Sequence, residues 1–187
     1  IGDLTEHAAG RDFLLDAESF WQVHPAAADT LVGAVLDGLR PGPGERVFDL
    51  FCGVGLFTGA LVDAGCRAWG VEWSKSAITH ARHNVPEARF TAAKVDRALR
   101  TLPKRTDLVV LDPPRAGAGR TVVNAVLTRR PRAIAYVACD PAAFARDLRR
   151  ALDGGYRPTS LRAFDLFPMT HHLEVVAILE PETSAEA

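Results

Sequence analysis

The chain has little of what disulfide-bonded, secreted or membrane-spanning proteins require. Its 187 residues include only three cysteines, Cys52, Cys66 and Cys139, which cannot all pair with one another and show no Cys-x-x-Cys spacing. Neither a disulfide framework nor a cysteine-based metal site is therefore expected. The longest apolar runs fall far short of a membrane span, and no basic stretch followed by an apolar segment indicates a secretory signal. These absences favour a reducing, cytoplasmic setting with no membrane partner and no bound metal.

Lysine is also scarce, with 3 lysines against 19 arginines, although the net charge is only −1. Arginine suits bidentate contacts with phosphate, but a biased genome composition gives the same ratio and is the more ordinary explanation. The hydrophobic fraction of 48% and the charged fraction of 24% are typical of one globular domain with a proper core. The chain begins with Ile1 rather than methionine, so we expect a fragment or a processed chain.

Apolar runs alternate with helical patterns from residue 46 onward, which predicts parallel β-α units. The expected strands comprise residues 47–51, 68–71, 89–91, 108–111 and 133–137, and the expected helices comprise residues 56–64, 74–84, 95–101, 120–127 and 141–152. Two further apolar runs, 159–165 and 173–179, are joined by a connection too short for a helix, so they form an antiparallel pair. The sequence therefore predicts an α/β fold with a mainly parallel, seven-stranded sheet and one antiparallel strand.

Three parts of the chain differ in character. Residues 1–45 form an N-terminal segment with Phe-Trp-Gln-Val at 20–23 and a helix expected at 25–39. Residues 46–180 carry the α/β pattern and form the main domain. Residues 181–187 are rich in Glu, Thr, Ser and Ala, so we expect a disordered tail there.

A glycine-rich loop follows the first strand of the α/β pattern and opens a helix, as in nucleotide-binding folds. Gly53 and Gly55 would let the backbone approach a ligand closely, although tight packing of a strand on a helix also selects glycine. Glu72 ends the second strand, nineteen residues after Gly53, where such folds place an acid for ribose hydroxyls. Together these features favour nucleoside binding.

The same loop disfavours a dinucleotide. The pattern G-x-G-x-x-G/A has Thr58 at its third position. The loop also begins with Asp49, which would repel a pyrophosphate but could orient a cationic cofactor without phosphate. S-adenosylmethionine fits that description.

Two groups indicate covalent chemistry at one edge of the sheet. Cys139 follows the fifth strand, where the chain turns into a helix, and Glu174 lies at the start of the antiparallel strand. That start meets the ends of the parallel strands, so both side chains are expected near Gly53, Glu72 and Asp112. Either group alone could be structural, the cysteine as a buried apolar residue and the glutamate as a surface acid.

A thiol, a carboxylate and a methyl donor together match methylation of a pyrimidine at carbon 5. That carbon becomes nucleophilic only after a thiol adds to carbon 6, and a base must then remove the carbon-5 proton so that the thiol can leave. Asp112 opens the sequence Asp-Pro-Pro-Arg and is available to the cofactor or to a planar substrate. The prolines stiffen this loop, although Asp-Pro-Pro is also an ordinary way to leave a strand.

These residues resemble the catalytic domain of the RNA uridine-5-methyltransferases, which modify tRNA or 23S rRNA. The resemblance covers nearly the whole chain and rests on residues 20–22, 49–55, 112–117, 136–141 and 165–174. It implies a Rossmann-like class I methyltransferase domain over residues 46–180, with S-adenosylmethionine as cofactor and RNA as partner.

The resemblance also implies a role for individual positions. Cys139 matches the family's nucleophile and Glu174 its proton-abstracting base. His172 matches the histidine of the Phe-Pro signature and would shape the loop that faces the substrate. The family's cofactor contacts match Gln22, Phe51, Leu56, Glu72 and Asp112, which join Gly53 and Gly55 of the glycine loop; the position of Leu56 is polar in some members.

The chain departs from the family pattern at several places. The usual Ser-Cys-Asn-Pro has Ala138 and Asp140 around the cysteine, and a customary threonine is Ala143. These changes leave the reacting groups intact but can alter how the base is held or which RNA is accepted. Members usually carry further amino-terminal RNA-binding regions, often an OB-like domain, and some bind an iron–sulfur cluster through four cysteines. This chain has neither the length nor the cysteines for either.

RNA phosphate contacts are expected from Arg115 and Arg120, which follow the fourth strand on the reactive edge. Arg129, Arg130 and Arg132 precede the fifth strand and are expected at the opposite edge. With few basic groups near the site, the sequence predicts weak, salt-sensitive RNA binding by this chain alone.

Three rival functions remain open. An RNA 5-methylcytosine enzyme would place a cysteine after a proline in the fourth-strand motif, where this chain has Arg115. An amino-group methyltransferase would have an aromatic residue after Asp-Pro-Pro and would not need Cys139. A non-catalytic cofactor-binding module is favoured only if the regions missing from this chain are essential.

Overall fold

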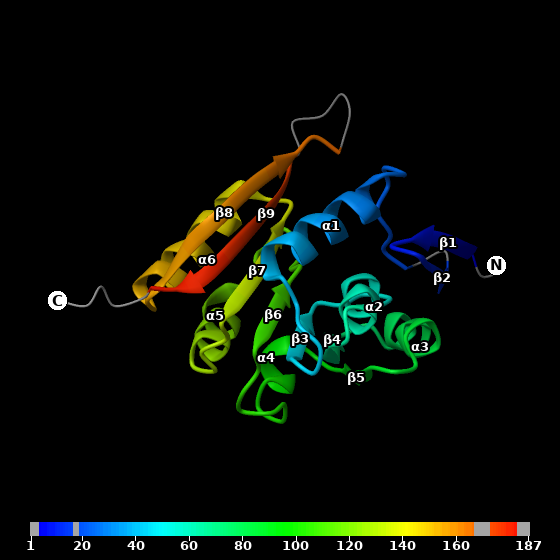
Figure 1. The fold of residues 1–187 in the computed structure, drawn as a ribbon, viewed down its shortest axis with the longest axis horizontal. Helices are drawn as coiled ribbons and strands as arrows, with labels where there is room; N and C mark the ends of the chain where they lie inside the picture. The colour runs from blue at the N-terminus through cyan, green and yellow to red at the C-terminus, as the bar shows by residue number, and fades with distance from the viewer. Residues whose placement is uncertain (1–3, 17–18, 167–172, 183–187) are drawn as a thin grey trace.

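The structure, a computed structural model, describes residues 4–16, 19–166 and 173–182. Nine strands and six helices lie in these ranges (Figure 1). The strands are β1 (Leu4–Ala8), β2 (Arg11–Leu15), β3 (Arg46–Leu50), β4 (Arg67–Glu72), β5 (Arg89–Ala92), β6 (Leu108–Leu111), β7 (Ala133–Ala138), β8 (Tyr156–Phe164) and β9 (Glu174–Pro181). The helices are α1 (Ala27–Leu39), α2 (Leu56–Asp63), α3 (Lys75–Asn84), α4 (Val95–Ala98), α5 (Gly119–Leu127) and α6 (Pro141–Asp153).

Seven strands form one sheet in the order β5-β4-β3-β6-β7-β9-β8. Strands β3 to β7 are parallel to one another, whereas β9 is antiparallel to both β7 and β8. The predicted mainly parallel, seven-stranded sheet with one antiparallel strand is therefore confirmed. The chain winds outward from β3 to β5 and then returns to β6 beside β3. In open α/β sheets, ligands bind at such a reversal, beyond the carboxyl ends of the strands.

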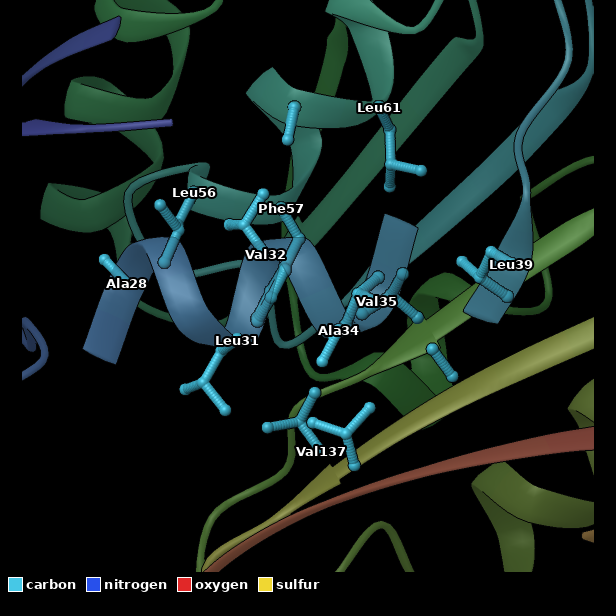
Figure 2. Close-up of a cluster of buried hydrophobic side chains, with 14 of the residues drawn as sticks. Ala28, Leu31, Val32, Ala34, Val35, Leu39, Leu56, Phe57, Leu61 and Val137 are labelled. Carbon is cyan, nitrogen blue, oxygen red and sulfur yellow. The ribbon is translucent and has the colours of Figure 1, made fainter. Parts of the chain in front are cut away.

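Helices cover both faces of this sheet because its central strands are apolar on both sides. All residues of β6 and β7 are buried, which is typical of parallel strands between two helical layers. One core joins α1 and α2 to the sheet, and Figure 2 shows the side chains of α1 between those of α2 and Val137 of β7. A second core joins α4, α5 and α6 to the opposite face. Each large aliphatic side chain buried in these cores contributes about 1.5–3 kcal/mol.

The N-terminal segment contains a hairpin, β1–β2, that the sequence did not predict. Its tight turn places Ala9 and Gly10 at positive φ, 51° and 75°, as two-residue hairpins require. Phe13 of β2 is fully buried, and the Arg11 guanidinium forms a bidentate pair with Asp63 of α2 at 2.6 and 2.7 Å. The carboxamide of Asn84 accepts from the Leu14 N–H at 2.9 Å and donates to the Leu14 carbonyl at 3.0 Å. The hairpin is thus fixed to α2 and α3.

The predicted elements occur in the right order, and a few boundaries differ. Strand β8 begins at Tyr156, with an irregularity between Pro158 and Ser160, and helix α4 is one short turn instead of residues 95–101. Strand β9 runs to Pro181, which pairs with Tyr156, so it enters the predicted tail by one residue. Residues 183–187 lie outside the described residues. In the described part of the chain, no helix has the length and hydrophobicity to cross a membrane.

Candidate active site

The strand registers bring the predicted site residues to one edge of the sheet. Leu50 of β3 pairs with Val71 of β4 on one side and with Leu111 of β6 on the other. The residues that follow these three are Phe51, Glu72 and Asp112, so all three lie at the carboxyl edge of the sheet. Strand β7 ends at the same edge, and the antiparallel strand β9 begins there. Five separate segments of the sequence therefore converge on one site, as the sequence predicted.

The glycine loop after β3 is held in an unusual backbone conformation. Phe51 has a φ of 70°, although a bulky side chain disfavours this left-handed region. The N–H groups of Phe51 and Cys52 both donate to the carbonyl of Val71, at 2.8 and 3.0 Å. Gly53 and Gly55 follow with φ values of 52° and 97°. Strained backbone of this kind persists where the surrounding structure holds it and is frequent at ligand sites.

Asp49 lies beneath this loop and is fully buried. Its Oδ2 accepts a hydrogen bond from the Thr58 hydroxyl at 2.5 Å, whereas its Oδ1 is buried with no hydrogen-bond partner among the described residues. Burial raises the pKa of Asp49 to about 6, with a further contribution from the negative charge of Glu72. A cation placed above the loop would stabilise the ionised form of this carboxyl group.

Glu72 is fixed at the end of β4 by the start of the next helix. Its Oε1 accepts the N–H groups of Trp73 at 2.7 Å and Ser74 at 2.9 Å, and the Ser74 hydroxyl in turn caps α3 by accepting the Ala77 N–H at 3.2 Å. This carboxylate is therefore oriented before any ligand binds. Leu56 is buried at the start of α2, and Ala28 of α1 belongs to the same cluster (Figure 2). Gln22 lies half-buried in the loop that leads into α1.

A hollow of about 530 Å³ opens beside Phe51, between α4 and the start of α5. Sequence reasoning missed most of its lining. The tryptophan directly after Glu72, at a strand end, is a signal that the sequence does contain. In the structure the Trp73 side chain is 71% exposed. Arg120, predicted to contact RNA, lines this hollow. The lining residues are Phe51, Trp73, Lys94, Val95, Asp96, Ala118, Gly119, Arg120, Thr121 and Val122.

The reacting pair predicted from the sequence lies on neighbouring strands. Ala138 of β7 pairs with Val175 of β9, and continuing this antiparallel register by one residue sets Cys139 opposite Glu174. Opposite residues of an antiparallel pair have side chains on the same face, about 4.5–5.5 Å apart at Cβ. Cys139 is partly exposed, whereas Glu174 is only 6% exposed. The partly exposed Cys139 thiol therefore lies beside the buried Glu174 carboxyl group.

Electrostatics couple this pair to its neighbours. Burial raises the pKa of Glu174 to about 7, and the positive charge of Arg115 opposes this shift. Burial, followed by the charges of Glu174 and Asp112, raises the pKa of the Cys139 thiol, which Arg115 again opposes. Asp112 has a pKa well above its usual range, first because of burial and then because of Glu174, Asp49 and Glu72. Pairs of titratable groups with pKa values displaced in this way are characteristic of active sites.

The departures around Cys139 preserve the local structure. The Asp140 carboxylate caps α6 by accepting the Ala143 N–H at 2.7 Å, a position that aspartate and asparagine fill equally well. Ala138 and Ala143 are both buried. Asp140 therefore serves the helix and leaves Cys139 and Glu174 as the adjacent reactive groups.

Two other predictions concern the margins of the site. His172 lies outside the described residues. Arg132, predicted at the far edge, pairs there with Glu45 at 2.6 Å, immediately before β3. Among the described residues, no group of three or more His, Cys, Asp or Glu side chains could hold a metal ion.

Comparison with known proteins relates the chain to RNA methyltransferases. Residues 102–182 match the family model of the tRNA (uracil-5-)-methyltransferases. An uncharacterized RNA methyltransferase of Streptomyces avermitilis is 55% identical over 183 residues, which cover 94% of this chain and 42% of that protein. Another, from Thermosynechococcus vestitus, is 37% identical over 182 residues, which cover 94% of this chain and 40% of that protein. The chain therefore spans less than half the length of these curated relatives.

Solved structures give the same relationship. The tRNA (uracil-54, C5)-methyltransferase of Pyrococcus abyssi, solved with S-adenosyl-L-homocysteine, superimposes with a TM-score of 0.80 and 33% identity, over 95% of this chain and 44% of that one. TYW2 of M. jannaschii, solved with AdoMet, has a TM-score of 0.65 and 16% identity, over 96% of this chain and 87% of that one, and is alike in fold alone. These likenesses confirm the predicted Rossmann-like methyltransferase fold.

Proposed function

The chain is related to the tRNA (uracil-5-)-methyltransferases, and on this premise we propose that it methylates carbon 5 of a uridine in RNA through a covalent adduct of Cys139. The observation that carries the proposal is the register of β7 and β9, which leads to Cys139 and Glu174 as opposite residues at the cofactor edge. RNA is proposed as the substrate only of the domain that this chain contains, because the chain spans less than half the length of its relatives. The domain division at residue 45 and the cytoplasmic setting remain predictions.

S-adenosylmethionine fits the residues at this edge. The buried Asp49 Oδ1, which has no hydrogen-bond partner among the described residues, would face the positive charge of the amino-acid part of the cofactor. Glu72 would accept hydrogen bonds from the ribose hydroxyls, since its carboxylate is already oriented by two backbone N–H groups. Phe51 and Trp73, which line the hollow, would offer aromatic faces to the adenine. Gln22, Leu56 and Asp112 complete the proposed cofactor contacts.

The reaction assigns separate steps to the two opposite residues. The Cys139 thiol loses its proton to solvent, and its sulfur forms a bond to carbon 6 of the uracil. The double bond between carbons 5 and 6 opens to an enolate, whose carbon 5 is nucleophilic. Bound S-adenosylmethionine would supply the methyl group that carbon 5 accepts. Glu174 then takes the carbon-5 proton, the double bond between carbons 5 and 6 re-forms, and the sulfur leaves as a thiolate.

The raised pKa of Glu174 supports its role as the base. With a pKa of about 7, the carboxyl group is roughly half ionised at neutral pH, which suits a group that must accept a proton in turnover. Arg115, whose charge keeps this pKa from rising further, would also face the uracil or its phosphate. Below pH 7 the methylation rate is expected to fall as Glu174 becomes protonated.

Trapping with 5-fluorouridine tests the proposal directly. Fluorine at carbon 5 cannot leave as a proton, so RNA carrying 5-fluorouridine and supplied with S-adenosylmethionine should accumulate a covalent adduct that survives denaturing gels. Cys139→Ala should abolish the adduct, whereas Cys66→Ala, which changes a buried cysteine outside the site, should leave it intact. RNA with 5-fluorocytidine should not be trapped. No adduct, with cofactor binding confirmed and tRNA and 23S rRNA both supplied, would support the non-catalytic alternative.

Glu174→Gln provides the complementary arm of the same experiment. On ordinary uridine, this variant should form the methylated adduct but release it slowly, because no carboxylate removes the carbon-5 proton. Normal turnover by Glu174→Gln would assign the base to another group.

A further inference from the structure

Another buried carboxylate, Asp147, joins three segments near the carboxyl edge of the sheet. Asp147 lies in the second turn of α6 and is only 3% exposed. Its Oδ2 accepts the N–H groups of Ala118 at 2.8 Å and Gly119 at 3.1 Å, and also the hydroxyl of Tyr136 at 2.8 Å. Its Oδ1 accepts from Arg150 at 3.1 Å. One side chain of α6 therefore holds both the start of α5 and the middle of β7.

The loop that carries Arg115 rests directly on this carboxylate. The N–H of Gly117 donates to the carbonyl of Pro114 at 2.8 Å, which closes a turn with Arg115 at its first inner position. Gly117 has a φ of 84°, and a Cβ atom at this residue would lie 2.8 Å from the Asp147 Oδ2. The backbone of the turn can approach the carboxylate so closely only because residue 117 is glycine.

The segments that Asp147 holds are those that surround the reacting groups. Tyr136 precedes Cys139 by three residues on the buried strand β7. Arg115, on the turn, is the positive charge that acts on both Cys139 and Glu174, against the negative charges of Asp112 and of the pair itself. A small displacement of the turn would therefore change the charge balance at the thiol while leaving α6 and β7 in place.

We propose that Asp147 is a positioning residue, which fixes the turn at residues 114–117 so that the Arg115 guanidinium acts on Cys139 and Glu174. Its catalytic consequence rests on the proposed function, whereas its effect on the Cys139 thiol does not. A role limited to capping α5 is the competing explanation, because a carboxylate at two N-terminal N–H groups stabilises a helix in any case.

The test perturbs the contact from both sides. Asp147→Asn keeps the shape but removes the charge, and Gly117→Ala inserts a methyl group against the unchanged carboxylate. Thr106→Val is the matched control, because Thr106 is buried, donates its hydroxyl to the carbonyls of Arg46 and Leu108, and lies at the opposite edge of the sheet. Arg115→Gln shows the effect of losing the cation itself.

The first readout needs no RNA. The rate of Cys139 alkylation by iodoacetamide is followed against pH, with the modified peptide identified by mass spectrometry. Arg115→Gln, Asp147→Asn and Gly117→Ala should each move the profile to higher pH by about one unit, and Thr106→Val should not. In the double variant Arg115→Gln/Asp147→Asn, the second change should add no further shift.

The second readout is methylation of RNA. Asp147→Asn and Gly117→Ala should lower kcat about tenfold, as small misplacements of catalytic groups do, with a smaller change in KM. An unchanged alkylation profile in both variants, together with a loss of thermal stability like that of Thr106→Val, would overturn the proposal in favour of simple capping. If Asp147→Asn does not fold, Gly117→Ala decides the question together with Tyr136→Phe, which removes the hydroxyl that donates to Asp147 and accepts from the Ala118 N–H. A chain that methylates no RNA would refute the proposed function, while the alkylation profiles would still test Asp147.

Discussion

At the scale of single residues, the site contains several acidic groups whose burial disfavours their ionised form. Asp49, Asp112 and Glu174 each have a raised pKa, with burial as the first cause. Arg115 is the cation that acts on the reacting pair. Ionising these carboxyl groups in the folded chain costs free energy. Groups of this kind are frequent at sites that bind a cationic ligand or transfer a proton.

This cost gives Glu174 a measurable effect on stability. Because its pKa rises from an ordinary value of 4.5 to about 7 in the folded chain, protonation favours the fold. The stabilisation is fully present below pH 4.5 and is lost as the pH rises through 7. Glu174→Gln, which carries no charge at any pH, should therefore raise the free energy of unfolding by about 3 kcal/mol at pH 8, with a much smaller gain at pH 5.

Urea unfolding of both proteins at pH 5 and pH 8 checks this expectation. Glu182→Gln is a suitable control, because this exposed acid lies at the opposite end of β9. A gain that is equal at both pH values, or a loss at pH 8, would contradict the buried, partly protonated state of Glu174.

At the scale of elements, periodicity in the sequence predicted the sheet and its helices well. The apolar run of β6 is predicted with its observed bounds, and β7 differs by one residue, because buried parallel strands are continuous apolar segments. The short connection before β9 predicted its antiparallel direction, and with it the meeting of Cys139 and Glu174. The β1–β2 hairpin escaped prediction because four of the five β1 residues are exposed and its turn lacks the Asn-Gly or Asp-Gly signal.

Contacts between distant elements could not be predicted in the same way. The role of Asp147 depends on α6 lying against the start of α5, which no local pattern encodes. The Oδ1 of Asp49 has no hydrogen-bond partner in the described ranges because the Thr58 hydroxyl donates to Oδ2 instead. The hollow beside Trp73 is formed by four segments that are separate in sequence. Such features follow from tertiary packing and not from spacing along the chain.

The glycine loop gives a prediction at this scale. Gly55→Ala would place a Cβ atom at a φ of 97° and 3.3 Å from Cγ2 of Val85. The change should cost about 1–2 kcal/mol of stability and displace the loop, so S-adenosylhomocysteine should bind about tenfold more weakly. Gly44→Ala is the matched control, since Gly44 has a φ of 82° but no atom within 4 Å of the added Cβ, in a turn outside the site.

Calorimetric titration and urea unfolding separate the two effects of these variants. Both alanine variants should lose similar stability, but only Gly55→Ala should lose cofactor affinity. Equal affinities in the two variants would mean that the loop does not contact the cofactor closely.

At the scale of the whole molecule, the site lies at one edge of a sheet whose faces are already covered by helices. Two cores bury the faces, and the candidate site residues lie at the carboxyl edge instead. The net charge is −1, and the positive groups near this edge include Arg115, Lys94 and Arg120, of which Lys94 and Arg120 line the hollow. The relatives are more than twice as long as the part that this chain covers. RNA binding by this chain should therefore rest on few phosphate contacts.

This arrangement predicts weak, salt-sensitive binding of RNA through few phosphate contacts. Each phosphate contact contributes about −0.7 to the slope of log K against log salt for single strands, so two contacts give a slope of about −1.4. Fluorescence anisotropy with a labelled tRNA stem-loop measures it between 50 and 200 mM salt, a range over which a slope of about −1.4 lowers the affinity about sevenfold. Arg115→Gln should reduce the slope by about 0.7, because a phosphate contact is lost. Arg105→Gln, an exposed arginine at the opposite edge before β6, should leave it unchanged. Tight binding that persists at moderate salt would show that this domain recognises RNA through contacts other than these few cations.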